Sequence, residues 1–440
     1  MAKYVMKFGG TSLKDAEAIK RVYNIVRSFY QAKKPDQLIV VVSGPGKVGE
    51  GKLEDKFTNL LEQIHRNENF DVNKREILSR MGRICSDLRI KNPRRLYKGF
   101  RQLTSGGGDR GYSETVSYGE RFSIRAVSDF FRLEGLEARS LDYDRFGMLT
   151  EGNKDASATE QANSEIEKSL ANKRGVIVLP GFLGFNKAHE VTTLGRDGSN
   201  YTATKVAEAI EADEVFIFSD EPGVRRASPK HVPDAEVLKE LSYDEAIEFA
   251  ELGAKIINAK SIYPAIEANL PISIVDENFR GTRISGKVSL EHMGAKIIAS
   301  SSDNYVLTVR YRADKPGVLR RIGGGFEDAG INIEGLGDER HALSLAFSQD
   351  EIKNIGEVME KLKDYNLSLE NGFARISVIG EGMRHQVGLL NRITSCFSDK
   401  GISFEMASQS AHQLNVSSFI PQIYERMAVR KLYDELFGKD

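Results

Sequence analysis

The chain has 440 residues, of which 40% are hydrophobic and 28% are charged, a composition typical of a globular protein with roughly two to four domains. Its formal net charge is −1, so no overall field favours nucleic acid or a membrane surface. The cysteines, Cys85 and Cys396, are too few for a disulfide framework or a cysteine-based zinc site, and they fit a reducing compartment. No apolar leader and no run of 18 apolar residues occurs, so we expect a cytoplasmic protein.

The N-terminal segment predicts a strand, a glycine-rich turn and a helix. Tyr4–Phe8 is a short apolar strand, KFGGTS (Lys7–Ser12) follows it, and Asp15 begins a helix whose apolar residues recur with helical spacing. The glycines let the backbone approach a phosphate, and Lys7 can place a positive charge on it. The P-loop spacing GxxxxGK[ST] and the dinucleotide fingerprint GxGxxG are both absent, and a plain tight connection is the simpler alternative.

Further apolar runs continue this alternation up to about residue 290. They predict strands at Leu38–Val42, Val176–Leu179, Val215–Phe218 and Ile272–Val275, with helical stretches between them. Residues 64–105 are charged and are expected to be helical. The pattern indicates an α/β domain with a mostly parallel sheet between helices. Ligands of such sheets bind beyond the carboxyl ends of the strands, where we expect both the Lys7–Ser12 turn and Ser43–Gly46.

The segment TTLGRDGSNYTA (Thr192–Ala203) predicts another glycine-rich turn, which we also expect at the carboxyl end of a strand of this parallel sheet. Leu194 ends an extended run and Thr202–Ala212 has helical composition, so Arg196 and Ser199 fall where a strand passes into a helix. Free N–H groups and a positive dipole end favour an anion there, and Arg196 adds a planar fork for a carboxylate or phosphate. A helix start capped by a serine is the alternative. With Lys7, the segment predicts a site for two anionic groups.

An internal repeat appears after residue 290. Gly317–Glu334 reads GVLRRIGGGFEDAGINIE, and 71 residues later Gly388–Glu405 reads GLLNRITSCFSDKGISFE, with nine of 18 positions identical. Each copy follows an apolar strand, at Val306–Tyr311 and Ala374–Ile379, and continues as a helix, a glycine stop and another strand. Repeated supersecondary units normally pack together. The sequence therefore predicts two copies of a small βαβ-type module.

Taken together, these motifs resemble the aspartokinase family over essentially the whole chain. The segments that carry the resemblance, in the expected order, are KFGGTS, VVSGPGK (Val41–Lys47), SYGERFS (Ser117–Ser123), TTLGRDGSN (Thr192–Asn200), SDEPGV (Ser219–Val224), LSYDEAIEFAELGAKII (Leu241–Ile257) and SQS (Ser408–Ser410). The resemblance implies an amino-acid-kinase domain over residues 1–290 and a regulatory region over 291–440. That region would hold two ferredoxin-like βαββαβ ACT domains with cores near 304–371 and 373–437, and a strand near 295–300 could belong to the second.

The resemblance also implies a reaction. ATP with Mg²⁺ would phosphorylate the side-chain carboxylate of L-aspartate to 4-phospho-L-aspartate, the first step toward lysine, threonine and methionine (diaminopimelate) biosynthesis. A carboxylate is already a nucleophile, so no general base is required, and catalysis reduces to positioning and charge neutralisation. A homo-oligomer, at least a dimer, is implied, with lysine or threonine as a possible effector at the ACT domains.

Site residues follow by the same resemblance. Lys7 and Asp220 would be catalytic, Arg196 would bind the substrate α-carboxylate, and Glu120 would accept its α-ammonium. The full substrate set is Ser43, Thr58, Glu120, Arg196 and Ser199. The nucleotide and its phosphates would contact Lys7, Gly9, Gly10, Thr11, Ser219, Asp220, Arg225, Lys230 and Lys255, with no metal ligand assigned. The segment from Arg225 to Lys230 is otherwise simply a basic surface loop.

Several positions depart from the family pattern. Asn200 stands where the family has an aspartate that orients the lysine, because a motif ending GGSD reads DGSN here. Arg225 replaces a tyrosine, Asn258 and Ala259 end a motif that is GAKVLHP in the family, and GDERH (Gly337–His341) replaces an effector-loop TSE.

These departures leave two alternatives to an active aspartokinase: a paralogue acting on another amino acid, and a non-catalytic amino-acid sensor. The retained Lys7, Glu120, Arg196, Ser199 and Asp220 favour an active enzyme. If Asn200 is a drifted orienting residue, Asn200→Asp preserves or raises turnover. If the site has been rebuilt around a neutral side chain, the same substitution lowers turnover.

Overall fold

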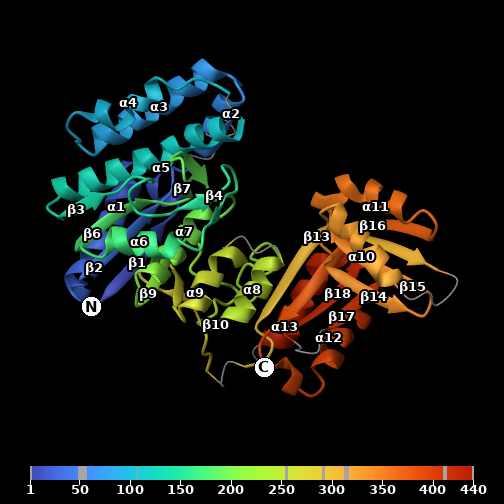
Figure 1. Ribbon diagram of the computed structural model, residues 1–440. Helices are drawn as coiled ribbons and strands as arrows, with labels where there is room; N and C mark the ends of the chain where they lie inside the picture. The colour runs from blue at the N-terminus through green and yellow to red at the C-terminus, as the bar shows by residue number, and fades with distance from the viewer. Residues whose placement is uncertain are drawn as a thin grey trace. The chain divides into compact units, whose positions relative to one another are not determined.

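The computed structural model describes residues 2–47, 57–106, 108–252, 256–289, 293–311, 317–409 and 414–438. The chain forms two compact units (Figure 1). The N-terminal unit comprises Met1–Val224, Lys239–Tyr243 and Ile256–Gly286. The C-terminal unit comprises Arg225–Leu238, Asp244–Lys255 and Lys287–Asp440. No helix in the described ranges has the length and apolar character needed to cross a membrane.

A mostly parallel sheet forms the centre of the N-terminal unit. Its strands are β1 (Lys3–Phe8), β2 (Gln37–Val42), β3 (Ala138–Ser140), β6 (Gly175–Pro180), β9 (Glu214–Phe218), β10 (Glu240–Ser242), β11 (Ile272–Val275) and β12 (Gly281–Ser285). Their order is β10-β12-β11-β9-β1-β2-β6-β3, and every neighbouring pair is parallel except β11 with β12. The strands predicted from the apolar runs are confirmed.

Helices cover both faces of this sheet. Those of the N-terminal unit are α1 (Ala16–Lys33), α2 (Phe57–His65), α3 (Phe70–Asp87), α4 (Lys98–Arg101), α5 (Gly108–Leu133), α6 (Ala162–Leu170), α7 (Gly198–Ala209) and α9 (Tyr263–Glu267), with 3₁₀ turns η1 (Gly10–Leu13), η2 (Pro93–Tyr97) and η3 (Ala259–Ser261). Helices α1 and α5 share one core with the strand residues Met6 and Val40. Alternate strand residues face the other side, where α7 packs on β1, β2 and β9. Helix α3 lies outside α5 (Figure 1).

The start of α1 follows the sequence prediction. Asp15 is its N-cap, and its side chain accepts a hydrogen bond from the N–H of Ala18 at 2.8 Å. The predicted helical character of residues 64–105 is also confirmed, by α3, η2 and α4.

The turn that carries Arg196 differs from the expectation in one respect. It follows β8 (Val191–Thr193), which pairs antiparallel with β7 (Leu183–Phe185) in a separate two-stranded sheet. A second small sheet pairs β4 (Thr150–Glu151) with β5 (Ser157–Ala158). The sequence shows an extended run but not its partner, so the expectation that this turn ends a strand of a parallel sheet is wrong.

The C-terminal unit is built on an antiparallel sheet with the order β14-β15-β13-β16-β18-β17. The strands are β13 (Ile297–Arg310), β14 (Gly335–Glu339), β15 (Ala342–Ser348), β16 (Asn366–Ile379), β17 (Met406–Gln409) and β18 (Asn415–Pro421). The helices are α10 (Val318–Asp328), α11 (Ile355–Lys361), α12 (Leu389–Ser398) and α13 (Glu425–Phe437), with 3₁₀ turns η5 (Gln349–Asn354), η6 (Met383–His385) and η7 (Gln422–Tyr424); α8 (Tyr243–Glu251) joins this unit after its first residue. Residues 297–301 of β13 pair with 375–379 of β16, and residues 304–310 pair with both β15 and β16.

The predicted repeat is confirmed by this unit. Helices α10 and α12 occupy the same place in the two copies, and each has a left-handed glycine as its N-cap, Gly317 with φ 90° and Gly388 with φ 83°. The glycine stops also match, with φ 66° at Gly330 and 65° at Gly401. Glycine adopts these angles without the steric cost that a Cβ would bring, which explains why these four positions are retained between the copies.

Candidate active site

Two glycine-rich turns stack on each other at the carboxyl ends of β1 and β2. The N–H of Gly46 donates to the carbonyl of Gly10 at 2.8 Å. A Cβ on Gly46 would lie 2.5 Å from the carbonyl carbon of Gly10, closer than any side chain can approach. The turn after β2 is therefore held against the turn after β1 because both positions lack a side chain.

The start of α7 joins the same place. Ser43 Oγ donates to Ser199 Oγ at 2.9 Å, and a Cβ on Gly181 would lie 2.6 Å from the Cβ of Ser199. Ser199 lies inside the helix, whose N-cap is Asp197, and no side chain caps that end. The alternative of a serine cap is therefore wrong, and the Ser199 hydroxyl faces the turn that carries Ser43 instead.

Glu120 is a buried carboxyl group in this cluster. It lies on α5 with only 5% of its surface exposed, and its Oε1 accepts the N–H of Gly44 at 2.8 Å. Burial raises the pKa of Glu120 to about 7, although the Gly44 hydrogen bond opposes the rise. A group with this pKa is ready to ionise fully when a cation arrives beside it.

Lys7 brings a positive charge to the end of β1. Its ammonium folds over the following turn, with Nζ 3.5 Å from the place where a Cβ of Gly9 would be. Burial lowers the pKa of Lys7, and the carboxylates of Asp197 and Asp220 oppose that change. No hydrogen bond or ion pair joins the Lys7 ammonium to any described residue, so its N–H donors are available to an anionic ligand.

Two other predicted substrate residues lie at the edge of the cluster. Arg196 is exposed, and its guanidinium makes no hydrogen bond or ion pair within the described ranges. Thr58 is the second residue of α2, and the N–H of Phe57 before it donates to the carbonyl of Pro45 at 3.3 Å. Helix α2 thus begins beside the turn after β2, but no hydrogen bond ties Thr58 itself to the other predicted residues that the structure describes.

The predicted nucleotide residues are divided between several places. In the N-terminal unit, Thr11 and Asp220 line a cavity of about 360 Å³ together with Asp276, Glu277 and Arg280. Ser219 Oγ accepts the N–H of Glu221 at 3.3 Å and turns the chain after β9.

Three further basic residues of the predicted nucleotide set are not part of the N-terminal unit as the structure describes it. Arg225 and Lys230 belong to the C-terminal unit, where Arg225 Nη1 donates to the carbonyl of Ala235 at 2.8 Å and Lys230 is exposed. Lys255 lies outside the described residues.

No dedicated metal cage forms among the residues described. Among the described residues, no group of three or more His, Cys, Asp or Glu side chains is arranged to hold a metal ion. Magnesium in phosphoryl-transfer sites is held mainly by phosphate oxygens, water and one or two carboxylates. The carboxylates along the 360 Å³ cavity are oxygen donors of that kind, so a nucleotide-borne Mg²⁺ fits this site.

One residue of the cluster, Asp197, is not among those predicted from the sequence. Asp197 accepts hydrogen bonds from Asn200 Nδ2 at 2.6 Å and from the N–H of Asn258 at 3.0 Å. Burial raises the pKa of Asp197, while the Lys7 ammonium is the first of the groups that oppose the rise. The available signal was an acid in a motif position where the family has glycine.

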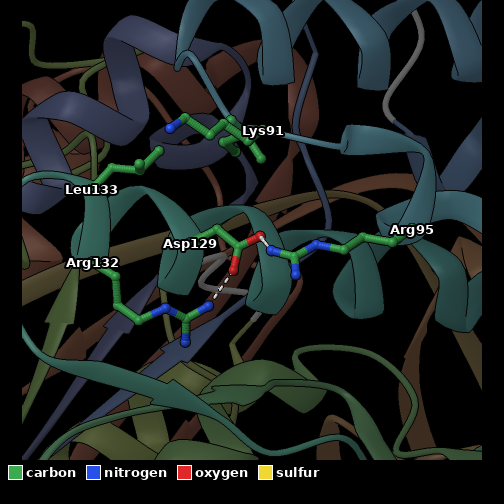
Figure 2. A pocket seen from close by; sticks show the side chains of 6 residues that line it. Lys91, Arg95, Asp129, Arg132 and Leu133 are labelled. Carbon is green, nitrogen blue, oxygen red and sulfur yellow. Dashed lines mark hydrogen bonds and ion pairs between the residues drawn. The ribbon is translucent and has the colours of Figure 1, made fainter.

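A second pocket, away from these turns, is formed around a buried ion-pair cluster. It is lined by Arg95, Asp129 and Arg132, whose side chains point toward one another (Figure 2). The carboxylate of Asp129 is buried and binds Arg95 Nη2 at 2.5 Å and also Arg132 Nη2. Both carboxylate oxygens of Asp129 are thus engaged, and the cluster joins α5 to η2.

The arrangement of parallel strands and converging glycine turns agrees with the comparisons. The chain belongs to the amino acid kinase family, which matches residues 2–276, and an ACT domain matches residues 376–436. An aspartokinase of Geobacillus stearothermophilus is 27% identical over 446 residues, which cover 100% of this chain and 98% of the relative.

Solved structures show the same fold. Aspartokinase III of E. coli in complex with aspartate and ADP superimposes with a TM-score of 0.81 at 23% identity, covering 99% of both chains. The same enzyme in complex with lysine and aspartate gives a TM-score of 0.76, again at 23% identity and 99% coverage of both chains.

Proposed function

We propose that this protein is an aspartate kinase that transfers the γ-phosphoryl group of ATP, with Mg²⁺, to the side-chain carboxylate of L-aspartate. The observation that carries the proposal is that two ionisable groups lie at one set of turns. They are the Lys7 ammonium, which has no hydrogen-bond partner among the described residues, and the buried Glu120 carboxyl group. One suits a phosphoryl group and the other an α-ammonium. The similarity to aspartokinases over the full chain supports the same substrate.

The chemistry needs little from the protein beyond placement and charge. A side-chain oxygen of aspartate attacks the γ-phosphorus, the bond to the β-phosphate oxygen breaks, and ADP leaves with the electron pair. Lys7 neutralises charge on the transferring group, and the N–H groups of Gly9 and Gly10 donate to its oxygens. Mg²⁺, when bound, neutralises charge on the phosphates.

Side chains next to the turns bind the functional groups of the substrate and so select it. Arg196 binds the α-carboxylate of aspartate as a planar fork. Glu120 accepts the α-ammonium, while Ser43, Thr58 and Ser199 contribute hydroxyl contacts. Within the N-terminal unit, Thr11, Ser219 and Asp220 complete the set that we assign to the nucleotide.

Hydroxylamine trapping tests this function. An acyl phosphate reacts with hydroxylamine to give a hydroxamate, so protein, ATP, Mg²⁺ and aspartate should yield aspartate hydroxamate, and succinate, which lacks the ammonium, should yield far less. Hydroxamate from another amino acid in place of aspartate would assign a divergent paralogue. No hydroxamate from any acidic amino acid would reject the kinase and leave an amino-acid sensor.

Regulation and assembly are part of the proposal. We infer a homo-oligomer, at least a dimer, and lysine or threonine as effector of the C-terminal unit, in an enzyme that opens a route to lysine, threonine and methionine. Support for assembly comes from Leu319 and Leu390, which occupy the same position in the two repeats and are 59% and 50% exposed. Support for an effector comes from the E. coli aspartokinase III complex with lysine.

The raised pKa of Glu120 gives a pH-dependent prediction for stability. Between the ordinary pKa of 4.5 and its value of about 7 in this fold, the folded state holds a proton that the unfolded chain has lost, so stability falls as pH rises through this window. Glu120→Gln keeps the acceptor for Gly44 and removes the charge. We therefore expect the variant to be more stable than the parent above pH 7, by on the order of 3 kcal/mol, with the two alike near pH 4. Urea unfolding at several pH values measures this.

Catalysis should show the complementary effect. The aspartate KM of the parent should fall as pH rises from 6 to 8, because Glu120 ionises and attracts the α-ammonium, and Glu120→Gln should lose this dependence. Glu62→Gln, on α2, serves as the matched control. A KM independent of pH in the parent would argue against Glu120 as the ammonium ligand.

A further inference from the structure

Arg80 is a charged residue on the apolar face of helix α3. It falls on the same face as Ile77, Met81 and Ile84, which are all buried, and only 6% of its own surface is exposed. A guanidinium stays charged in a protein, so its burial is costly unless its N–H groups find acceptors. The contacts of this side chain therefore indicate what it does.

The Arg80 guanidinium reaches two other segments of the N-terminal unit. Its Nη2 donates to the carbonyl of Gly46, in the turn after β2, at 2.6 Å, and this hydrogen bond is buried. Its central carbon lies 4.7 Å from the centroid of the Phe57 ring, which is a cation–π contact. Phe57 is the first residue of α2 and is fully buried. One side chain thus joins α3 to the turn after β2 and to the start of α2.

A chain of hydrogen bonds leads from Phe57 to the turn after β1. The N–H of Phe57 donates to the carbonyl of Pro45 at 3.3 Å. The same peptide unit carries the N–H of Gly46, which donates to the carbonyl of Gly10 at 2.8 Å. The next unit, from Gly10, carries the N–H of Thr11. The described peptide bonds are trans, so the C=O and N–H of one unit point in opposite directions and the Thr11 N–H points away from Gly46. Linked hydrogen bonds polarise one another, which makes this N–H a stronger donor.

We propose that Arg80 is a positioning residue for the phosphate-binding turn after β1. It contacts Gly46 and Phe57, the two residues whose N–H groups form the chain, and so fixes the direction of the Gly10 peptide unit. The inference rests on the proposed function, in which that turn binds the phosphates of ATP. Arg80 acts through Gly46 and Gly10, and not by a contact of its own with the nucleotide.

The residues before Gly46 in the same turn have other contacts that fix them. Ser43 Oγ donates to Ser199 Oγ at 2.9 Å, and the N–H of Gly44 donates to Glu120 Oε1 at 2.8 Å. Ser43, Ser199 and Glu120 are residues that we assign to aspartate. Loss of the Arg80 guanidinium should therefore weaken the binding of the nucleotide more than the binding of aspartate.

Arg80→Met tests this difference, because methionine keeps an apolar side chain and removes the guanidinium. It should raise the KM for ATP about tenfold, the usual effect of losing one hydrogen bond to a charged group, with the aspartate KM within about twofold of the parent. Arg80→Lys should show a smaller change in the same direction, because an ammonium can still donate to the Gly46 carbonyl.

Asn73→Ala is the matched control for a general weakening of α3. Asn73 is also buried on this helix, and its Nδ2 donates to Gln63 Oε1 of α2 at 2.8 Å. Its contacts are with α2 alone among these elements and do not include the turn after β2. The control variant should lower the melting temperature and leave the KM for ATP within about twofold of the parent.

Amide hydrogen exchange gives a readout that is independent of activity. The N–H of Gly46 is protected by its hydrogen bond to Gly10, so its exchange rate, measured without nucleotide, reports whether the two turns stay together. The rate should rise at least about threefold in Arg80→Met and stay at the parent value in Asn73→Ala. If Arg80→Met does not fold, the same measurements on Arg80→Lys decide.

Three results would overturn the proposal: an unchanged Gly46 exchange rate in the folded variant, an ATP KM within about twofold of the parent, or equal increases in the KM values for ATP and aspartate. If the parent makes no hydroxamate, the kinase proposal fails, and the Gly46 exchange rate still decides whether Arg80 positions the turn.

Discussion

Replacing Lys7 by methionine should lower kcat by at least about a hundredfold, the usual cost of losing one charged or hydrogen-bonding group at developing negative charge. Methionine keeps the length and the apolar stem of lysine and removes only the ammonium. The ammonium has no described hydrogen bond to lose, and burial lowers its pKa, so the fold should tolerate the change. Stability should therefore be maintained or rise, while activity falls.

Steady-state hydroxamate formation and thermal unfolding measure the two effects of Lys7→Met. Lys20→Met is the matched control, since Lys20 lies on α1 with 41% of its side chain exposed and pairs with Glu17. Activity of Lys7→Met within about threefold of the parent would show that Lys7 does not stabilise the transferring group.

Replacing Arg196 by alanine should lower kcat/KM for aspartate by at least about tenfold, or roughly 1.4 kcal/mol, chiefly through a higher KM. Arg196 is exposed and unpaired within the described residues, so its loss removes a ligand contact and little folding energy. Arg196→Lys should recover part of the effect, because a single ammonium cannot form the two parallel bonds of a guanidinium.

A substrate analogue makes the Arg196 prediction specific. β-Alanine is aspartate without its α-carboxylate, so its kcat/KM should be the same for the parent and for Arg196→Ala. Arg66→Ala, at an exposed arginine on the surface, is the control for a general change of charge. Equal losses with aspartate and β-alanine would contradict the assignment of Arg196 to the α-carboxylate.

The sequence predicted the parts of the fold that depend on local pattern. Apolar runs such as Leu38–Val42 mark buried strands, and glycines such as Gly317 mark helix starts, because each signal lies within a few residues. The position of β8 was not predictable in this way, since pairing with β7 depends on a turn and not on the strand itself. The same limit applies to β13, which pairs with strands about 40 and 70 residues away.

The same distinction between local and long-range signals applies to the residues of the candidate site. Lys7 and Arg196 stand out because charged residues flanked by glycine turns are visible in the sequence. The burial of Glu120 could not be read from SYGE, since it depends on the approach of Gly44, in the turn after β2, to helix α5. Asp197 was overlooked because two of its donors, at Asn258 and Ser261, lie about 60 residues away and its meaning appears only when they meet.

The most direct test of the proposed function follows an oxygen atom. Aspartate labelled with ¹⁸O only in its side-chain carboxylate is incubated with ATP, Mg²⁺ and the protein, and the product is cleaved with hydroxylamine. Hydroxylamine attacks the acyl carbon, so the bridging oxygen leaves with phosphate. If the side-chain carboxylate attacks the γ-phosphorus, ³¹P NMR or mass spectrometry should find ¹⁸O in the released phosphate. Unlabelled phosphate would mean that water is the acceptor and would contradict the assignment of this protein as an aspartate kinase.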